Sequence, residues 1–372
     1  MIEIREALSK KELKVFVKFP FTIYKNSKYW VPPIIKQELS TFNKKENPVF
    51  KDADARFFLA YKNGKIAGRI VAIINWIEVN QQQVKKMRFG WFDFIDDMDV
   101  SKALLDTVMK IGKDKGLEFA EGPVGFSNLD KVGVMTEGFN HLGRMITWYN
   151  HPYYAKHYEA YGFKGEKYYL ENKFPFKNVK PEFFERIQAL VKKRYGLKAL
   201  DFSKTEEVME YADEMFDLFN ASYASLSSFV AISDLQKAYF KKKFISFINP
   251  EYIKFVLDKD NKLVAFAIVM PSFGKALQKA NGKLFPLGFK HLLHAKKHSK
   301  DVTFYLIGVH PSYQNKGVTG IIFDQYYHTF KEKGIQTCYR TPELSDNHAI
   351  HALWKDFNPE IYIRRNTFRK EL

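Results

Sequence analysis

The sequence predicts an α+β protein with two domains, and three observations lead to this prediction. Each half of the chain contains a pair of β-type segments joined by a polar turn, which is typical of a hairpin. Segments with the apolar spacing of helices lie between these strands. The length of 372 residues exceeds the usual size of one domain, roughly 100 to 200 residues.

The two hairpins are the clearest local signals. In the first half, residues 56–74 form two strand-like runs around an Asn63-Gly64 turn, a strong hairpin signal. In the second half, residues 252–257 and 263–270 flank a polar turn at 258–262. We therefore expect a similar sheet to begin in both halves.

A strand followed by a helix start marks the second half. Residues 302–309 are β-branched and aromatic, Pro311 ends this strand, and apolar residues then recur at helical spacing from Gly317 onward. Free N–H groups and the positive end of the helix dipole favour an anion at residues 314–320. Gly317 would let the backbone approach that anion closely.

A second strand and helix follow at 337–341 and 345–357. Ser345 or Asp346 is expected to cap this helix, and Ala349, Leu353 and Phe357 fall on one face.

The order of these segments resembles the C-terminal half of a domain from the GNAT superfamily of N-acetyltransferases. The resemblance implies, in each half, a mixed, mostly antiparallel twisted sheet flanked by helices. It also implies that acyl-CoA or acetyl-CoA binds with its pyrophosphate on the loop and its pantetheine arm between strands splayed near 307–309 and 338–341. The cofactor-binding residues implied are Ile307, Gly308, Val309, Gln314, Asn315, Lys316, Gly317, Val318, Thr319, Gly320, Asn347 and Trp354.

Two residues depart from the family pattern. Thr319 stands where Gly or Ala is usual, and Trp354 stands where a tyrosine often protonates the departing CoA thiolate. An indole N–H is not a useful acid, so the family mechanism cannot simply be copied.

The first half resembles a degenerate copy of the same fold. Residues 150–163 look like the family's last helix, with Tyr158 and Gly162 in the usual places. The run 92–100 has no glycine loop but carries Asp96, Asp97 and Asp99. These charges would repel a pyrophosphate. We therefore predict a degenerate domain at 1–176 without a CoA loop, a domain at 177–372 with the acyl-CoA site, and a boundary near residues 174–177.

The amino-acid composition limits the binding partners and the cellular location that we expect. The net charge of +17 favours a polyanionic partner such as CoA, an anionic membrane or nucleic acid, or simply reflects solvated lysines. RNA-binding signatures are absent, so no specific nucleic acid is expected. The single cysteine, Cys338, suits a reducing cytosol, and the charged N-terminus and lack of a long apolar run predict a cytoplasmic protein without a membrane span.

An insert at 274–300 mixes large apolar residues with seven lysines and no acid. One interpretation places it on the inner face of the membrane as a peripheral contact, and the other packs its apolar stripe on its own domain. The apolar residues that would enter the lipid are Leu284, Phe285, Leu287, Phe289, Leu292 and Leu293. His291, His294 and His298 lack a carboxylate or cysteine partner, so we expect no metal site.

The whole chain also resembles bacterial tandem-GNAT proteins of the ceramide-synthase type, through residues 19–24, residues 29–33 and the basic insert. This resemblance implies transfer of a fatty acyl group from acyl-CoA to a sphingoid-type lipid amine. Transfer needs a base and an acid near the thioester. The base candidates are His310, Glu343 and His351, and the acid candidates are Tyr305, Tyr313 and Tyr339.

Three alternatives stay open. The chain could acetylate a small soluble amine, or transfer amino acids from aminoacyl-tRNA, or bind acyl-CoA without catalysis. A working CoA loop argues against the second, and Trp354 is the best support for the third.

Overall fold

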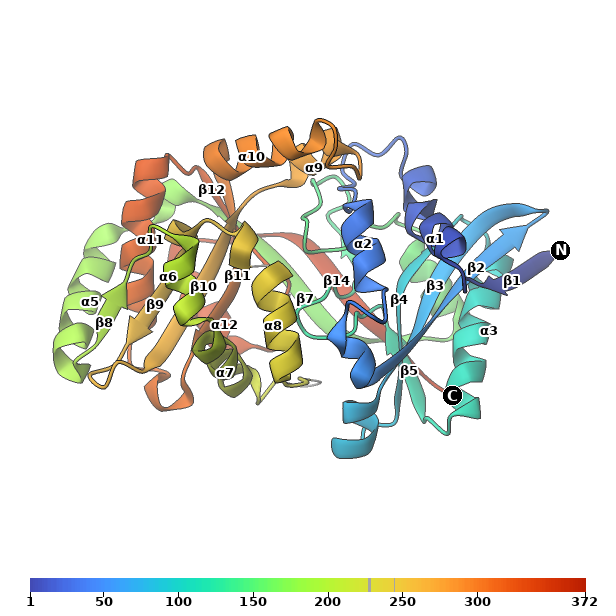
Figure 1. The fold of residues 1–372 in the computed structure, drawn as a ribbon, viewed down its shortest axis with the longest axis horizontal. Coiled ribbons are helices and arrows are strands. Elements are labelled where there is room, and N and C mark those ends of the chain that lie inside the picture. The colour runs from blue at the N-terminus through green and yellow to red at the C-terminus, as the bar shows by residue number, and fades with distance from the viewer. Residues whose placement is uncertain (227–228, 244) are drawn as a thin grey trace.

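Among the described residues, one mixed sheet of fourteen strands runs through the molecule, flanked by helices (Figure 1). The structure is a computed structural model that describes residues 1–226, 229–243 and 245–372. The strand order is β1-β2-β3-β4-β5-β14-β7-β12-β11-β10-β9-β8, with β6 beside β14 and β13 beside β7. This arrangement confirms the predicted α+β class.

The first half supplies seven strands and four helices to the described structure. Its strands are β1 (Ile2–Glu6), β2 (Ala53–Lys62), β3 (Lys65–Asn75), β4 (Lys86–Phe94), β5 (Phe119–Gly122), β6 (Val134–Glu137) and β7 (Lys164–Pro175). Its helices are α1 (Lys10–Ile23), α2 (Ile35–Thr41), α3 (Met98–Asp114) and α4 (Tyr154–Tyr161). The predicted first hairpin is β2–β3, whose Asn63 and Gly64 both have positive φ (51° and 77°), as a tight hairpin turn requires.

The second half repeats this order. Its strands are β8 (Lys198–Leu200), β9 (Ile253–Leu257), β10 (Leu263–Pro271), β11 (Asp301–Val309), β12 (Thr337–Arg340), β13 (Glu343–Leu344) and β14 (Glu360–Glu371). Its helices are α5 (Pro181–Tyr195), α6 (Thr205–Glu210), α7 (Ala212–Tyr223), α8 (Asp234–Lys243), α9 (Gly274–Ala280), α10 (Gly288–His298), α11 (Thr319–Lys333) and α12 (His348–Trp354). The predicted second hairpin is β9–β10.

The repeat is visible in strand pairing. Each half has one parallel pair, β4–β5 in the first and β11–β12 in the second, and the other pairs are antiparallel. A parallel pair needs a crossover connection, and α3 and α11 provide it. The two halves therefore place a strand, a loop and a helix start at corresponding positions.

The last strands of the two halves cross over between them. β14, at the end of the chain, lies between β5 and β7, and its Phe368 packs on Tyr158 in the first-half core with ring centroids 4.8 Å apart. β7 in turn pairs with β12 through Thr337–Tyr339. The two halves are therefore joined by main-chain hydrogen bonds within one sheet.

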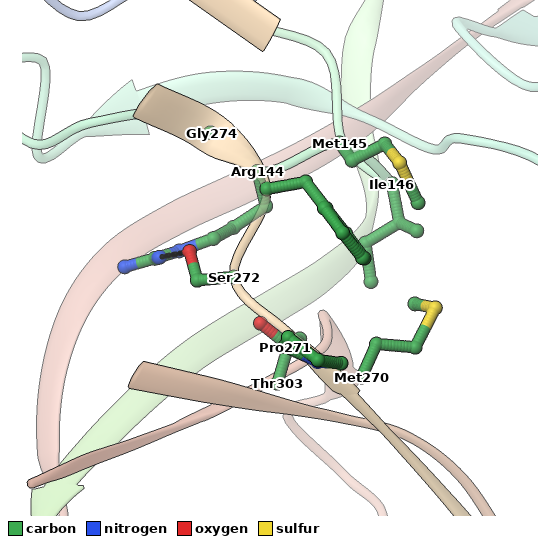
Figure 2. Close-up of a pocket in the computed structure, with 9 residues that line it drawn as sticks. Arg144, Met145, Ile146, Met270, Pro271, Ser272, Gly274 and Thr303 are labelled. Carbon is green, nitrogen blue, oxygen red and sulfur yellow. Dashed lines mark hydrogen bonds between the residues drawn. The ribbon is translucent and has the colours of Figure 1, made fainter. Parts of the chain in front are cut away.

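Buried polar contacts stabilise the seam, by which we mean the region where β7 and β14 join the two halves of the sheet. Arg365 of β14 and Glu171 of β7 form an ion pair in which both side chains are 0% exposed, and Tyr362 donates to the same carboxylate at 3.1 Å. Arg144 stacks on the Tyr339 ring at 3.3 Å and donates to Ser272 Oγ at 3.1 Å. Figure 2 shows Arg144 beside Ser272, where residues 144–146 face Met270 and Pro271 around a small cavity of about 10 Å³.

Candidate acyl-transfer site at the seam

An open strand edge begins where β11 leaves β12. The two strands pair only from Asp301 to Phe304 of β11. The hydrogen bond that Thr341 N donates to the Phe304 carbonyl, at 3.3 Å, is the last one before the strands separate. A bulge in the β10–β11 register falls at the same level, and Pro342 follows. Beyond this point the edge of β11 from Tyr305 to Val309 faces a gap, which can receive an extended ligand.

The loop after β11 leads into the start of α11. Asn315 and Gly317 both have positive φ (59° and 75°), and a Cβ on Gly317 would lie 3.1 Å from Val191. α11 begins without a side-chain cap in the described structure, so its first N–H groups point toward the loop without a side-chain acceptor. An anion is the acceptor that such a helix start favours.

A cavity of about 610 Å³ connects this loop, the open strand edge and the first half. Its second-half lining includes Tyr223 of α7, whose hydroxyl donates to the Ile307 carbonyl at 3.1 Å. Its first-half lining comes from β4, β5, β7, the segment 124–132 and Ile146. The site therefore belongs to both halves.

Most residues expected to bind the cofactor line this cavity. They are Ile307, Gly308, Val309, Gln314, Asn315, Gly317, Val318, Thr319, Asn347 and Trp354. Two others lie beside it: the Lys316 ammonium sits over the rings of Tyr195 and Tyr313, at 5.3 and 5.4 Å. Gly320 is buried, and a Cβ there would come within 2.5 Å of Ile187.

The six catalytic candidates separate into two groups. Tyr305, Tyr313 and Glu343 line the cavity, whereas His310, His351 and Tyr339 are absent from its lining. The two histidines are in other bonds: His310 accepts from Ser312 N at 3.2 Å, and His351 Nε2 donates to the Leu344 carbonyl at 2.9 Å. Tyr339 is covered by Arg144.

Glu343 is held by a cation. Arg340 donates to it through Nε at 3.0 Å and through a second nitrogen, and His351 Nδ1 lies 3.8 Å from the same carboxylate. Burial raises the pKa of Tyr305 well above its usual range, and the nearby Asp130 carboxylate adds to this effect. Both observations weaken these residues as base and acid.

Trp354 has an unpaired donor. Its side chain is 1% exposed, and Nε1 has no hydrogen-bond partner among the described residues. A buried unpaired N–H costs ~1 to 3 kcal/mol, so a ligand that accepts from it would recover this free energy.

The helix that carries Trp354 is capped by Asn347, which accepts from Ile350 N at 3.3 Å, so the prediction of Ser345 or Asp346 as the cap was wrong.

Comparison with known proteins agrees with this geometry. Residues 212–358 match the acetyltransferase (GNAT) family. A tandem GNAT protein from the clavulanic acid biosynthesis pathway shares the fold across 100% of this chain and 98% of its own, with a TM-score of 0.59 and 10% identity. The chain has a tandem GNAT-like fold.

Two curated relatives align over most of this chain. Protein YghO of Escherichia coli K12 is 24% identical over 99% of this chain and 95% of its own. The bacterial ceramide synthase of Caulobacter vibrioides is 23% identical over 82% of this chain and 79% of its own. A probable N-acyltransferase from Enterococcus faecalis shares the fold with a TM-score of 0.52 and 7% identity, over 100% of this chain and 73% of its own.

The first GNAT-like half differs at the equivalent helix start. Asp97 caps α3 and accepts from Asp99 N and Val100 N at 3.1 and 3.3 Å, so its own carboxylate occupies the place that an anion would take. The gap beyond the β4–β5 pair is also closed, because Val124 N donates to the Phe89 carbonyl at 2.8 Å.

The first half contributes residues that sequence reasoning missed. A largely buried group that we call the charged wall lines the cavity: Lys86, Arg88, Glu121 and Lys167. Lys86 and Arg88 pair with Glu78, and Lys167 pairs with Glu121 at 3.0 Å. No spacing in the sequence marks these residues as part of the second half's site, because only strand exchange brings them there.

Among the described residues, no three side chains of the metal-binding types come together. None of the helices that the structure describes combines the length and hydrophobicity needed to span a bilayer.

Within the insert at 274–300, Leu292 is 4% exposed and Leu284 packs on the second-half core. The interpretation in which all six apolar residues of the insert enter lipid was therefore wrong for these two.

Proposed function

We propose that this protein is an acyl-CoA-dependent N-acyltransferase that transfers a long acyl chain to a primary amine of the sphingoid type. The observation that carries the proposal is the single cavity that joins the α11 helix start to the open edge of β11. The GNAT family match supports N-acyl transfer from acyl-CoA or acetyl-CoA. The similarity to a protein named bacterial ceramide synthase supports the lipid acceptor.

The residues fit an acyl-CoA in two places. The uncapped start of α11 and the positive φ of Gly317 suit a pyrophosphate that lies against the backbone. The unpaired Trp354 Nε1 suits a carbonyl or sulfur acceptor deeper in the cavity. CoA would supply the activated thioester, and the chain's residues would hold it, exclude water and accept the amine's proton.

One CoA site per chain follows from the contrast between the halves. In the first half the α3 start is capped by Asp97, and segment 123–133 bridges to β4 through the Val124 hydrogen bond. We therefore assign the first half a role other than CoA binding, with a domain boundary near residues 174–177, although β14 crosses back into the first-half sheet.

The insert supplies a surface suited to an anionic membrane. Three apolar side chains, which we call the apolar rim, are largely exposed: Phe285, Leu287 and Leu293, at 76%, 57% and 59%. Exposed lysines surround them, including Lys283 and Lys290. Exposed apolar groups flanked by lysines favour the lipid interface over water.

A chain-length series tests the proposed donor. Purified protein would be mixed with sphinganine in detergent micelles and with acyl-CoAs from acetyl to stearoyl, and thiol release would be followed. If binding tracks buried CH₂ groups, each adds up to ~0.8 kcal/mol until the cavity is full, so long donors should win. A preference for acetyl-CoA would refute the lipid donor and leave acyl transfer intact.

A second candidate is acetylation of a small soluble amine. The charged wall favours it, because buried lysine, arginine and glutamate side chains suit a small polar acceptor better than a hydrocarbon tail. Glucosamine in place of sphinganine in the same assay separates the two candidates.

A further inference from the structure

A loop of the first half reaches the open strand edge of the second. The Tyr305 hydroxyl of β11 donates to the Leu129 carbonyl at 3.3 Å, and Val230 N donates to Asn128 Oδ1 at 3.2 Å. Residues 127–132 line the cavity together with Ile307 and Gly308. This first-half loop is therefore held at the cavity by hydrogen bonds from the second half.

Asp130 is fixed within that loop. Its Oδ2 accepts from Ser127 N at 2.9 Å and from Ser127 Oγ at 3.3 Å. Gly125 packs against it so closely that a Cβ at Gly125 would lie 2.2 Å from Asp130 Cβ. Local hydrogen bonds and the absence of a side chain at Gly125 thus hold the carboxylate in the cavity wall.

Three carboxylates line the cavity, and their partners differ. Glu121 pairs with Lys167 and Lys86, and Glu343 pairs with Arg340. The hydrogen bonds that Asp130 accepts come from the neutral Ser127. A carboxylate paired with a cation is a weak base, so Asp130 is the carboxylate best suited to receive a proton.

Its environment agrees with this role. Burial raises the pKa of Asp130 above that of an ordinary carboxyl, and this effect outweighs the opposing effects of the Lys243 charge and the Ser127 hydrogen bonds. The Asp130 carboxylate in turn raises the pKa values of Arg88 and Tyr305, which places its charge beside both side chains. A higher pKa makes the carboxylate a stronger base near neutral pH.

We propose that the first half provides the acceptor subsite of the second half's active site, and that Asp130 holds a primary alkylammonium there and takes its proton. This inference rests on the proposed acyl transfer. The acceptor subsite would give the first half a role in catalysis that does not require a second CoA site.

The transfer forms one carbon–nitrogen bond and breaks one carbon–sulfur bond. The acceptor ammonium gives one proton to the Asp130 carboxylate and becomes a neutral amine. The amine nitrogen bonds to the thioester carbonyl carbon, the carbon–sulfur bond breaks, and its electron pair leaves with sulfur. The second nitrogen proton reaches the thiolate to give CoA thiol, and Asp130 then releases its proton to solvent.

The test compares Asp130→Asn with wild type, using palmitoyl-CoA and sphinganine in micelles. We expect kcat/KM to fall by a factor of ~100 or more, as for loss of a general base. The CoA dissociation constant and Tm should stay near wild type, and the acid limb of the pH profile should disappear. Asp114→Asn, at an exposed ion pair with Lys110 at the end of α3, is the matched control and should change none of these values.

A second variant separates a base from a structural role. Asp130→Ala should lose activity and regain part of it in added formate, which can enter the space and accept the proton. Wild-type rates in Asp130→Asn, or a loss in Asp130→Ala that formate does not restore, would overturn the inference while wild-type transfer upholds the proposed function. If wild type binds no CoA and transfers no acyl group, the proposed function fails first and this inference falls with it.

Discussion

Gly317→Glu should abolish CoA binding with only a modest loss of stability. Gly317 has φ of +75°, and a Cβ there would lie 3.1 Å from Val191 Cγ2 and 3.5 Å from Ile187 Cγ2. A non-glycine residue in this left-handed region costs ~1 to 2 kcal/mol, and the contact with Val191 requires only a small shift. The fold should therefore survive with Tm lowered by a few degrees.

The effect on CoA should be larger, because the new carboxylate would lie beside the pyrophosphate. Two unit charges ~5 Å apart at an effective dielectric constant of ~20 interact by roughly 3 kcal/mol. Since 1.4 kcal/mol is a factor of ten, the repulsion from one phosphate charge alone weakens binding by ~100-fold. The added carboxylate would also offset the partial positive charge at the N-terminal end of α11.

Isothermal calorimetry with CoA measures this loss, and Gly334→Glu provides the control. Gly334 ends the same helix, has φ of +63° and is far along the chain from the loop, so its variant carries a similar backbone strain without a charge at the helix start. CoA affinity should be lost in the first variant and kept in the second. A folded Gly317→Glu protein with wild-type CoA affinity would refute this loop as the pyrophosphate site.

Three further outcomes are expected. Replacing the apolar rim with serines should abolish salt-sensitive sedimentation with anionic vesicles and leave Tm nearly unchanged, whereas Leu292→Ser, at a 4% exposed position, should lower Tm; unchanged sedimentation of the rim variant would contradict membrane docking. Burial raises the pKa of the Cys338 thiol far above its usual range, so at pH 8 a disulfide reagent should label it only after denaturation, and rapid labelling of native protein would contradict the buried placement. Glu171→Gln leaves the Arg365 charge buried without its partner, so the urea unfolding free energy should drop by ~3 to 5 kcal/mol; a change below ~1 kcal/mol would mean that the seam does not depend on this pair.

Local sequence patterns determined the repeated elements and the proposed donor side of the site. The Asn63-Gly64 turn, the strand that ends at Pro311 and the α11 start all depend on contacts within a few residues, so periodicity and turn chemistry are sufficient to place them. Most of the predicted loop residues line one cavity for the same reason. Helix caps were less predictable, since Asn347 rather than Ser345 or Asp346 caps α12.

Tertiary structure decided which half of the chain faces that loop. β14 enters the first-half sheet and β7 pairs with β12, and this exchange brings Asp130 and the charged wall to the open edge of β11. Strand pairing between distant segments leaves no periodic signal in the sequence, because each strand records only which of its faces is buried. The proposed acceptor side of the cavity is therefore a property of the assembled sheet, whereas the turn proposed to bind phosphate is already present in one short stretch of chain.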